Sequence, residues 1–153
     1  MITETQRELY RNRTEQFIKR LSKEILVEST HLKADYALTK EAVPFDERER
    51  LEYSPIIEGA HWGSTWESAW FKIRGTVPKQ WKGKRVVAQL DFNGEALIFN
   101  EEGLPLQGLT NGSIFERGYT RDIFPLYDKA EGNEEINLWI DAAAFSRFGV
   151  NRD

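Results

Sequence analysis

The sequence predicts a mainly-β fold, an antiparallel β-sandwich preceded by an N-terminal amphipathic α-helix. After residue 66, hydrophobic residues alternate with polar ones in several short runs, and turns rich in glycine and asparagine separate these runs. Before residue 28, hydrophobic residues recur at multiples of four in a segment without proline or glycine. Strands do not alternate with long helical patterns, which argues against a parallel α/β fold.

The N-terminal unit, residues 1–28, is predicted to be a helix over residues 3–27. Its apolar stripe consists of Leu9, Phe17, Leu21 and Ile25, and charged side chains occupy the opposite face. Thr3 and Gln6 have the spacing of a capping box. Because burying each large side chain contributes roughly 1.5–3 kcal/mol, we expect the stripe to lie against the sandwich, a neighbouring domain or a second copy of the chain.

Residues 29–60 are expected to form a linker with one short extended segment near Ile56 and Ile57. Proline and glycine punctuate this region at Pro44, Pro55 and Gly59. A charge-rich run over residues 46–52 is typical of a solvated face. The region is therefore predicted to contribute little to a core.

Residues 61–153 are expected to form the sandwich, in which period-two alternation fixes which side chains face inward. The residues predicted to point into the core are Phe71, Ile73, Leu90, Phe92, Leu138 and Ile140. The chain ends shortly after its last predicted strand, so it is expected to be either a compact protein or, as favoured below, a fragment of a longer enzyme.

Composition and charge exclude several classes of site and partner. The 21 basic and 25 acidic residues give a net charge of −4, which offers no electrostatic attraction to nucleic acid. No apolar run resembles a signal peptide or a membrane span, and the absence of cysteine suits the cytoplasm and excludes thiolate chemistry. The two histidines, His31 and His61, stand far apart without metal-ligand spacing, so no metal site or other cofactor is expected in this chain.

Tryptophans are the most informative side chains. Trp62, Trp66, Trp70 and Trp81 fall within twenty positions, and the first two lie in a predicted loop beside His61. Flat exposed tryptophans next to polar groups stack on sugar rings, whereas buried ones fill a core or meet a partner domain. His61, Trp62, Trp66 and Gln107 are the candidate residues for binding or for a domain junction.

Five motifs stand in order between Gly59 and Leu109. They are Trp70-Phe71, Val77-Pro78, Trp81-Lys82-Gly83, Gly94-Glu95-Ala96-Leu97 and Gly103-Leu104-Pro105-Leu106-Gln107-Gly108-Leu109. This ordered set resembles the region ahead of the catalytic barrel in the cytosolic type of α-mannosidases of glycoside hydrolase family thirty-eight. The resemblance covers about half of the chain.

The resemblance implies an accessory sandwich of the jelly-roll or galactose-binding-like kind. It implies a non-catalytic domain of an enzyme that hydrolyses terminal α-mannosyl linkages. Because a large catalytic domain would lie downstream and the loop is rich in tryptophan, we expect the face bearing His61, Trp62, Trp66 and Gln107 to pack against that domain. That catalytic domain would hold a zinc ion, bound by histidine and aspartates, and a nucleophilic aspartate. The required His-x-Asp motif is missing from this chain, so no catalytic or metal-binding residue is carried over.

Two other functions stay open at this point. The chain could be a free-standing carbohydrate-binding module whose exposed tryptophans bind a mannose-containing glycan, or a small independent enzyme with a paired-carboxylate site. A homo-oligomer that buries the helix stripe is compatible with each of the three functions. An exposed coplanar tryptophan pair would favour the module, and a buried carboxylate pair in a cleft would favour the enzyme.

Overall fold

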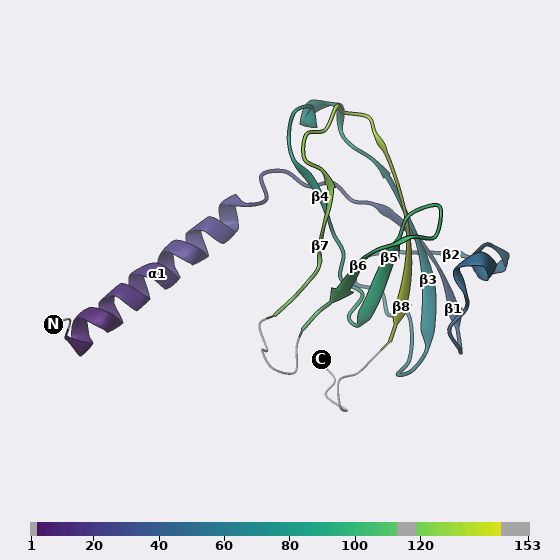
Figure 1. Ribbon diagram of the computed structural model, residues 1–153, viewed down its shortest axis with the longest axis horizontal. Coiled ribbons are helices and arrows are strands. Elements are labelled where there is room, and N and C mark those ends of the chain that lie inside the picture. Colours follow the sequence, from purple (N-terminus) through teal and green to yellow (C-terminus); the bar gives the residue numbers. More distant parts are fainter. Residues whose placement is uncertain (1–2, 113–118, 145–153) are drawn as a thin grey trace. The chain divides into compact units, whose positions relative to one another are not determined.

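The computed structural model describes residues 3–112 and 119–144 of the chain. It divides into two compact units, Met1–His31 and Leu32–Asp153 (Figure 1). Residues 113–118 and 145–153, which belong to the sandwich predicted over 61–153, lie outside the described residues. No helix among the described residues is long and apolar enough to cross a membrane.

The first unit contains helix α1, Glu4–Glu24. The predicted capping box is confirmed: the Gln6 backbone N–H donates to Thr3 Oγ1 at 3.3 Å, and the Thr3 N–H donates to Gln6 Oε1 at 3.0 Å. The helix ends with Ile25 as its C-cap, so the last residue of the predicted stripe stands at the helix end. None of the helix residues is buried, and burial of the stripe against another surface stays a prediction.

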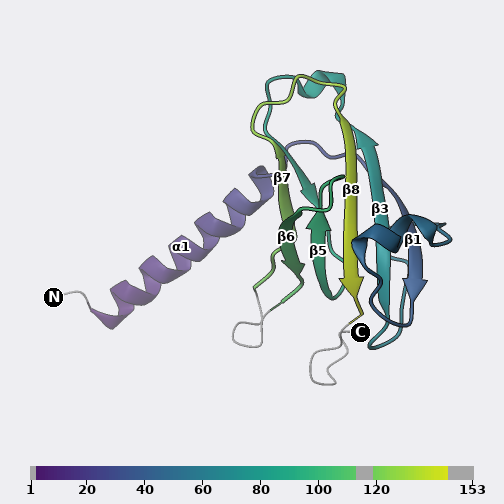
Figure 2. The ribbon, with the colours of Figure 1, turned by 45° about the vertical axis from the view of Figure 1, so that its right-hand side comes forward.

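The second unit is an antiparallel sandwich of two sheets. Its strands are β1 Lys33–Thr39, β2 Ser54–Ile56, β3 Ser68–Thr76, β4 Val86–Gln89, β5 Glu95–Phe99, β6 Pro105–Thr110, β7 Ile123–Tyr127 and β8 Glu135–Ala143. The larger sheet has the order β2-β1-β3-β8-β5-β6, and β4 and β7 form the smaller one. Two short 3₁₀ helices, η1 Phe45–Arg50 and η2 Lys79–Trp81, lie in the connections. Figures 1 and 2 show β7 facing the larger sheet.

The expected linker over residues 29–60 is largely part of the sandwich. Strand β1 pairs with β3 along its whole length, from Lys33 opposite Arg74 to Thr39 opposite Ser68. Only β2 corresponds to the extended segment expected near Ile56. The sequence does not predict β1 because its inward positions include a small residue, Ala34, which stands between the charged Lys33 and Asp35 and gives little hydrophobic signal.

The core lies between the two sheets, and all six residues predicted to point inward are buried. The larger sheet contributes aliphatic and aromatic side chains from β3, β5 and β8, and the smaller sheet contributes those of β4 and the residues after it. Ile98 and Ile140 stand opposite each other on β5 and β8 and are fully buried. The period-two prediction of inward side chains is therefore confirmed.

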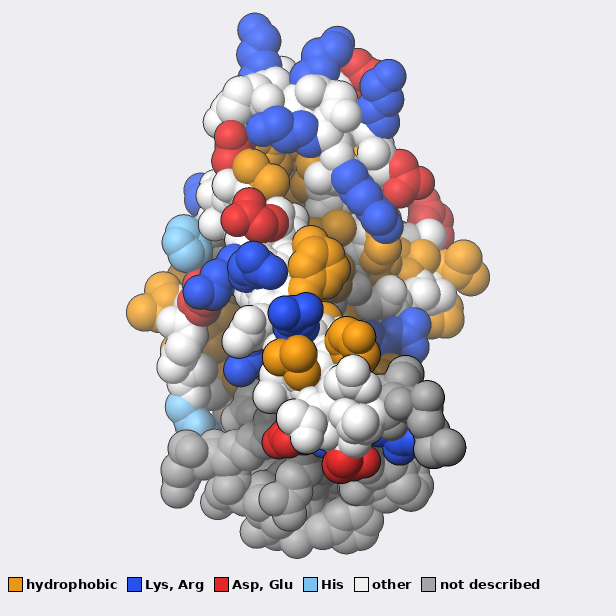
Figure 3. Space-filling view, turned by 90° about the vertical axis from the view of Figure 1, so that its left-hand side faces the viewer, with side chains coloured by type: hydrophobic (Ala, Val, Ile, Leu, Met, Phe, Trp, Pro, Cys, Tyr) orange, Lys and Arg blue, Asp and Glu red, His pale blue; other side chains and the backbone are white. Residues whose placement is uncertain are grey.

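The end of the sandwich that carries η2 is strongly charged. Lysine and arginine side chains gather at the top of Figure 3. In and near η2 and the turns beside it, the exposed basic residues are Lys79, Lys82, Lys84, Arg85 and Lys129. Two of them form exposed ion pairs, Lys82 with Glu131 at 3.0 Å and Arg85 with Asp128 at 3.6 Å. Such pairs contribute little to stability, so this end is a solvated surface.

Replacing Ile140 by alanine should lower the free energy of unfolding by about 2–5 kcal/mol, because it leaves a cavity between the two sheets. The same change at Ile57, which is 80% exposed, is the matched control and should change stability by no more than about 0.5 kcal/mol. Urea denaturation of both variants measures the difference. Equal effects at the two positions would contradict the assignment of the core.

Candidate domain-junction site

A loop over residues 60–67, here called the Trp66 loop, leads into β3 and is held against the end of β8. The Trp66 backbone N–H donates to the Ala144 carbonyl at 2.8 Å, and the Ala144 N–H donates to the Glu67 carbonyl at 2.8 Å. Within the loop, the Ser64 N–H donates to Glu67 Oε2 at 2.7 Å. These bonds fix the loop at the end of the sandwich opposite η2, because η2 follows the other end of β3.

Trp62 faces the core. Its indole N–H donates to the Phe92 carbonyl at 2.9 Å. Its ring meets Phe71 edge to face, with 5.2 Å between the centroids and 89° between the planes. Trp62 therefore closes this end of the sandwich, and its indole N–H is already used by the protein.

Trp66 has the opposite environment, since 73% of it is exposed. Its φ of 73° lies in the left-handed region, where a bulky side chain is an outlier and the backbone costs roughly 1–2 kcal/mol. Strain of this kind persists only where surrounding structure enforces it, and it clusters at functional positions. The loop thus displays a large hydrophobic side chain at a cost in stability.

The other two candidates do not join Trp66 in one cluster. His61 is an exposed residue of the same loop. Gln107 lies on β6, three strands from β3 in the sheet order, and its Nε2 donates to the Ile123 carbonyl on β7 at 2.9 Å. Thr110 and Arg121 exchange backbone hydrogen bonds of 3.1 and 2.8 Å at the same edge, so Gln107 helps to join the two sheets.

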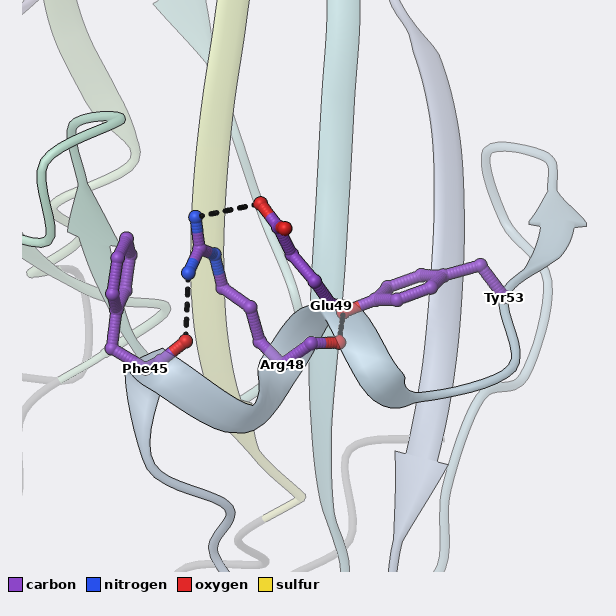
Figure 4. A network of polar contacts seen from close by, with 4 residues as sticks. All are labelled: Phe45, Arg48, Glu49 and Tyr53. Carbon is purple, nitrogen blue, oxygen red and sulfur yellow. Dashed lines mark hydrogen bonds and ion pairs between the residues drawn. The ribbon is translucent and has the colours of Figure 1, made fainter.

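A second feature, which sequence reasoning missed, covers the outer face of the larger sheet. Arg48 of η1 is only 7% exposed. Its guanidinium carbon lies 3.4 Å from the Phe45 ring centroid and 4.4 Å from that of Trp139. Nη1 donates to the Phe45 carbonyl at 2.7 Å, and Nη2 lies 3.3 Å from Glu49 Oε1 (Figure 4). Cation–π stacking and hydrogen bonds together offset the cost of burying this charge.

Aromatic side chains complete this outer cover. Trp70 is buried beneath Phe45 and Phe99, with its ring centroid 5.9 and 5.4 Å from theirs, and its indole N–H donates to the Val43 carbonyl at 2.8 Å. The signal was present in the sequence: Trp70 and Trp139 stand at the non-core positions of their strands. Large apolar side chains on both faces of the alternation indicate a sheet that is covered on both sides.

Tyr53 joins η1 to the outer face. Its hydroxyl donates to the Arg48 carbonyl at 2.9 Å, and its ring meets Trp139 edge to face at 5.8 Å. Burial raises the pKa of Tyr53 to about 12, although the Arg48 charge opposes the shift. These contacts hold the sheet's outer cover in place and supply no nucleophile or general base for a reaction.

Metal ligands are not assembled in the described ranges, 3–112 and 119–144: no three histidine, cysteine, aspartate or glutamate side chains there could hold an ion together. The arrangement is a packed sandwich with one exposed, strained tryptophan.

Comparison with known proteins places the chain among α-mannosidase segments. A family model described as the jelly roll domain of α-mannosidase matches residues 27–152. α-Mannosidase G of Dictyostelium discoideum is 28% identical over 113 residues, which cover 74% of this chain and 10% of that protein. α-Mannosidase 2C1 of Mus musculus is 27% identical over 115 residues, or 75% of this chain and 11% of the relative. The human protein of that name is 36% identical over 73 residues, or 48% of this chain and 7% of the relative.

Replacing Tyr53 by phenylalanine should lower the free energy of unfolding at neutral pH by about 0.5–1.5 kcal/mol, because the Arg48 carbonyl loses its donor. The raised pKa keeps the phenol protonated in the folded state. The contribution of the Tyr53 phenol to the free energy of unfolding is therefore fully present below about pH 10. It is lost as the pH rises toward about 12. The variant should lose less stability than the wild type across this range.

Urea denaturation between pH 7 and 12, with absorbance at the tyrosinate band, measures both effects. Tyr10→Phe on helix α1 is the control, since Tyr10 is 55% exposed. An alkaline loss of stability as steep in Tyr53→Phe as in the wild type would show that Tyr53 does not carry the effect.

Proposed function

Because the chain belongs to the family of α-mannosidase jelly roll domains, we propose that it is a non-catalytic N-terminal accessory domain of an α-mannosidase that hydrolyses terminal α-mannosyl linkages. The family match over residues 27–152 carries this proposal. The chain spans about a tenth of the length of the relatives it matches. A catalytic domain elsewhere in the same cytoplasmic polypeptide then performs the hydrolysis.

The zinc ion that the family resemblance implies belongs to that catalytic domain. Its ligands would be histidine and aspartate side chains, and the described part of this chain offers no group of three such residues. In this proposal the domain packs against the catalytic domain and takes no part in the chemistry.

The Trp66 loop is the junction in this proposal. A strained, exposed tryptophan is the kind of anchor that fills a pocket of a partner at an interface. The η2 end, by contrast, carries exposed ion pairs, and charged residues are depleted from interface cores. Within the site predicted from sequence, Trp66 and His61 would make contact with the catalytic domain, while Trp62 and Gln107 would support the end and the edge of the sandwich behind them.

A carbohydrate-binding module is the second candidate, and the 73% exposure of Trp66 is the observation in its favour. Sugar platforms work best when several aromatic rings present their faces together. Here the indole N–H of Trp62 donates to the Phe92 carbonyl, so Trp62 is committed to the sandwich and not to a sugar platform. A domain junction that takes up the Trp66 side chain accounts for its exposure and its positive φ better than a sugar platform does.

The isolated chain should not hydrolyse aryl α-mannosides, with or without added zinc. Release of the aryl alcohol by the purified protein measures this. Turnover that persists through purification and is abolished by a point substitution in this chain would refute the non-catalytic role.

Calorimetry of the isolated chain with mannose and mannan should show no binding. Millimolar or tighter binding that Trp66→Ala abolishes would establish the carbohydrate-binding module instead.

Trp66→Gly separates the junction from a merely structural role. In the isolated chain it relieves the positive φ, so the melting temperature should stay unchanged or rise. In the full-length polypeptide it removes the anchor, so the melting temperature should fall by about 2–4 °C or more. Asn133→Gly is the matched control: Asn133 has the same φ of 73° but lies at the η2 end, and its replacement should not lower either melting temperature. Equal effects of Trp66→Gly in both contexts would contradict the junction.

A further inference from the structure

The outer face of the larger sheet is covered unevenly. The η1 segment covers β3 and β8 at Trp70 and Trp139, and its Phe45 ring centroid also lies 5.4 Å from that of Phe99 on β5. Farther along the same face, β5 and β6 leave Leu97 and Leu106 36% and 44% exposed. We define the β8–β6 face as the surface formed by Asp141, Leu97, Gly108 and Leu106.

Asp141 is the first unusual member of this face. It stands at a non-core position of β8, directly opposite Trp70 on one neighbouring strand and Leu97 on the other. The carboxylate is half-buried and makes no hydrogen bond or ion pair within residues 3–112 and 119–144. Burial among these side chains raises the pKa of Asp141.

The cation nearest in register does not neutralise this carboxylate. Lys72 pairs with Trp139, which stands two residues before Asp141 on β8. The Lys72 ammonium lies 5.0 Å from the centroid of the Trp139 ring. The other charged neighbour in register is Glu95, whose carboxylate accepts a hydrogen bond from the Thr110 hydroxyl at 2.7 Å. Water can still donate to this half-buried carboxylate, and a cationic side chain that replaced the water would form a stronger, charge-assisted hydrogen bond.

Gly108 is the second unusual member. It stands opposite Leu97 in the interior of β6, where glycine weakens a strand. Its φ is not in the left-handed region, and a Cβ atom added there would meet only the Ala96 carbonyl oxygen at 3.9 Å. Nothing in the described structure requires glycine at this position. Strand glycines mark bulges or places where another backbone approaches closely. The register between β5 and β6 shifts between Ile98 and Phe99, one pair beyond Gly108, which itself pairs regularly with Leu97.

These observations point to a missing segment with a defined chemistry. We propose that the β8–β6 face is a second docking surface, on which an extended segment from the remainder of the same enzyme polypeptide places a lysine or arginine against Asp141 and passes its backbone over Gly108. Leu97 and Leu106 flank the path and would pack against the aliphatic part of that cationic side chain. The inference rests on the proposed function, since the matched segment makes up only 10% and 11% of two relatives, whose remainder is additional polypeptide.

Asp141→Asn tests the proposal by a change of sign. In the isolated chain it removes an unpaired half-buried charge, so the melting temperature should rise by about 2–4 °C. In the full-length polypeptide it removes the partner of the docked cation, so the unfolding transition of this domain should move to lower temperature. Differential scanning calorimetry follows both. Asp128→Asn, an isosteric change at a carboxylate paired with Arg85 at the η2 end, is the control and should leave both transitions unchanged within about a degree.

Gly108→Ala gives an independent reading. The added methyl group has room in the isolated chain, so the stability of that chain should be unchanged or higher. In the full-length polypeptide the methyl group should obstruct the docked backbone and lower the unfolding temperature of this domain. If both variants stabilise the full-length polypeptide as much as the isolated chain, the face is not docked and the proposal fails. That failure would leave the Trp66→Gly result intact, so the two proposals fail separately.

Two other occupants would also overturn the proposal. A second copy of this chain is indicated if the isolated chain sediments as a dimer that Asp141→Asn dissociates. A glycan is indicated if the isolated chain binds mannan in calorimetry and Asp141→Asn abolishes the binding while Trp66→Ala does not. If the proposal is right, the isolated chain does not dimerise through this face and does not bind mannan.

Discussion

Pairing between β3 and β8 is the constraint on which the rest of the second unit depends. Each strand is nine residues long, and the two pair from Ser68 opposite Ala143 to Thr76 opposite Glu135. Both strands carry apolar side chains on both faces. Their aliphatic face faces β4 and β7, and their tryptophans face the other way, so the sheet needs a cover on each side. The sandwich supplies one cover, and η1 with Arg48 supplies the other.

The same pairing also places the surfaces that we assign to partners. It brings Ala144 to the Trp66 loop, where two backbone hydrogen bonds hold a tryptophan in a strained conformation. It also sets Asp141 between Trp70 and Leu97 on the outer face of the larger sheet. Both surfaces carry residues that cost the isolated domain stability, and this is why we propose that other polypeptide covers them.

Sequence patterns predicted the parts of this structure in which a single physical effect dominates. The buried alternation around Phe71 and Ile140 and the Thr3 capping box follow from burial and from local hydrogen bonding, and both are confirmed. Strand β1 and η1 were missed because small residues and a buried arginine carry no hydrophobic signal. The inward turn of Trp62 and the strain at Trp66 depend on backbone conformation, which the order of residues does not reveal.

Side-chain footprinting with hydroxyl radicals tests most directly the central claim that the Trp66 loop meets the catalytic domain. Oxidation of Trp66 is compared between the isolated chain and the full-length polypeptide, with the 80% exposed Ile57 as the internal reference. The account predicts that Trp66 is oxidised readily in the isolated chain and is protected in the full-length polypeptide, while Ile57 reacts equally in both. Equal oxidation of Trp66 in the two proteins would contradict it.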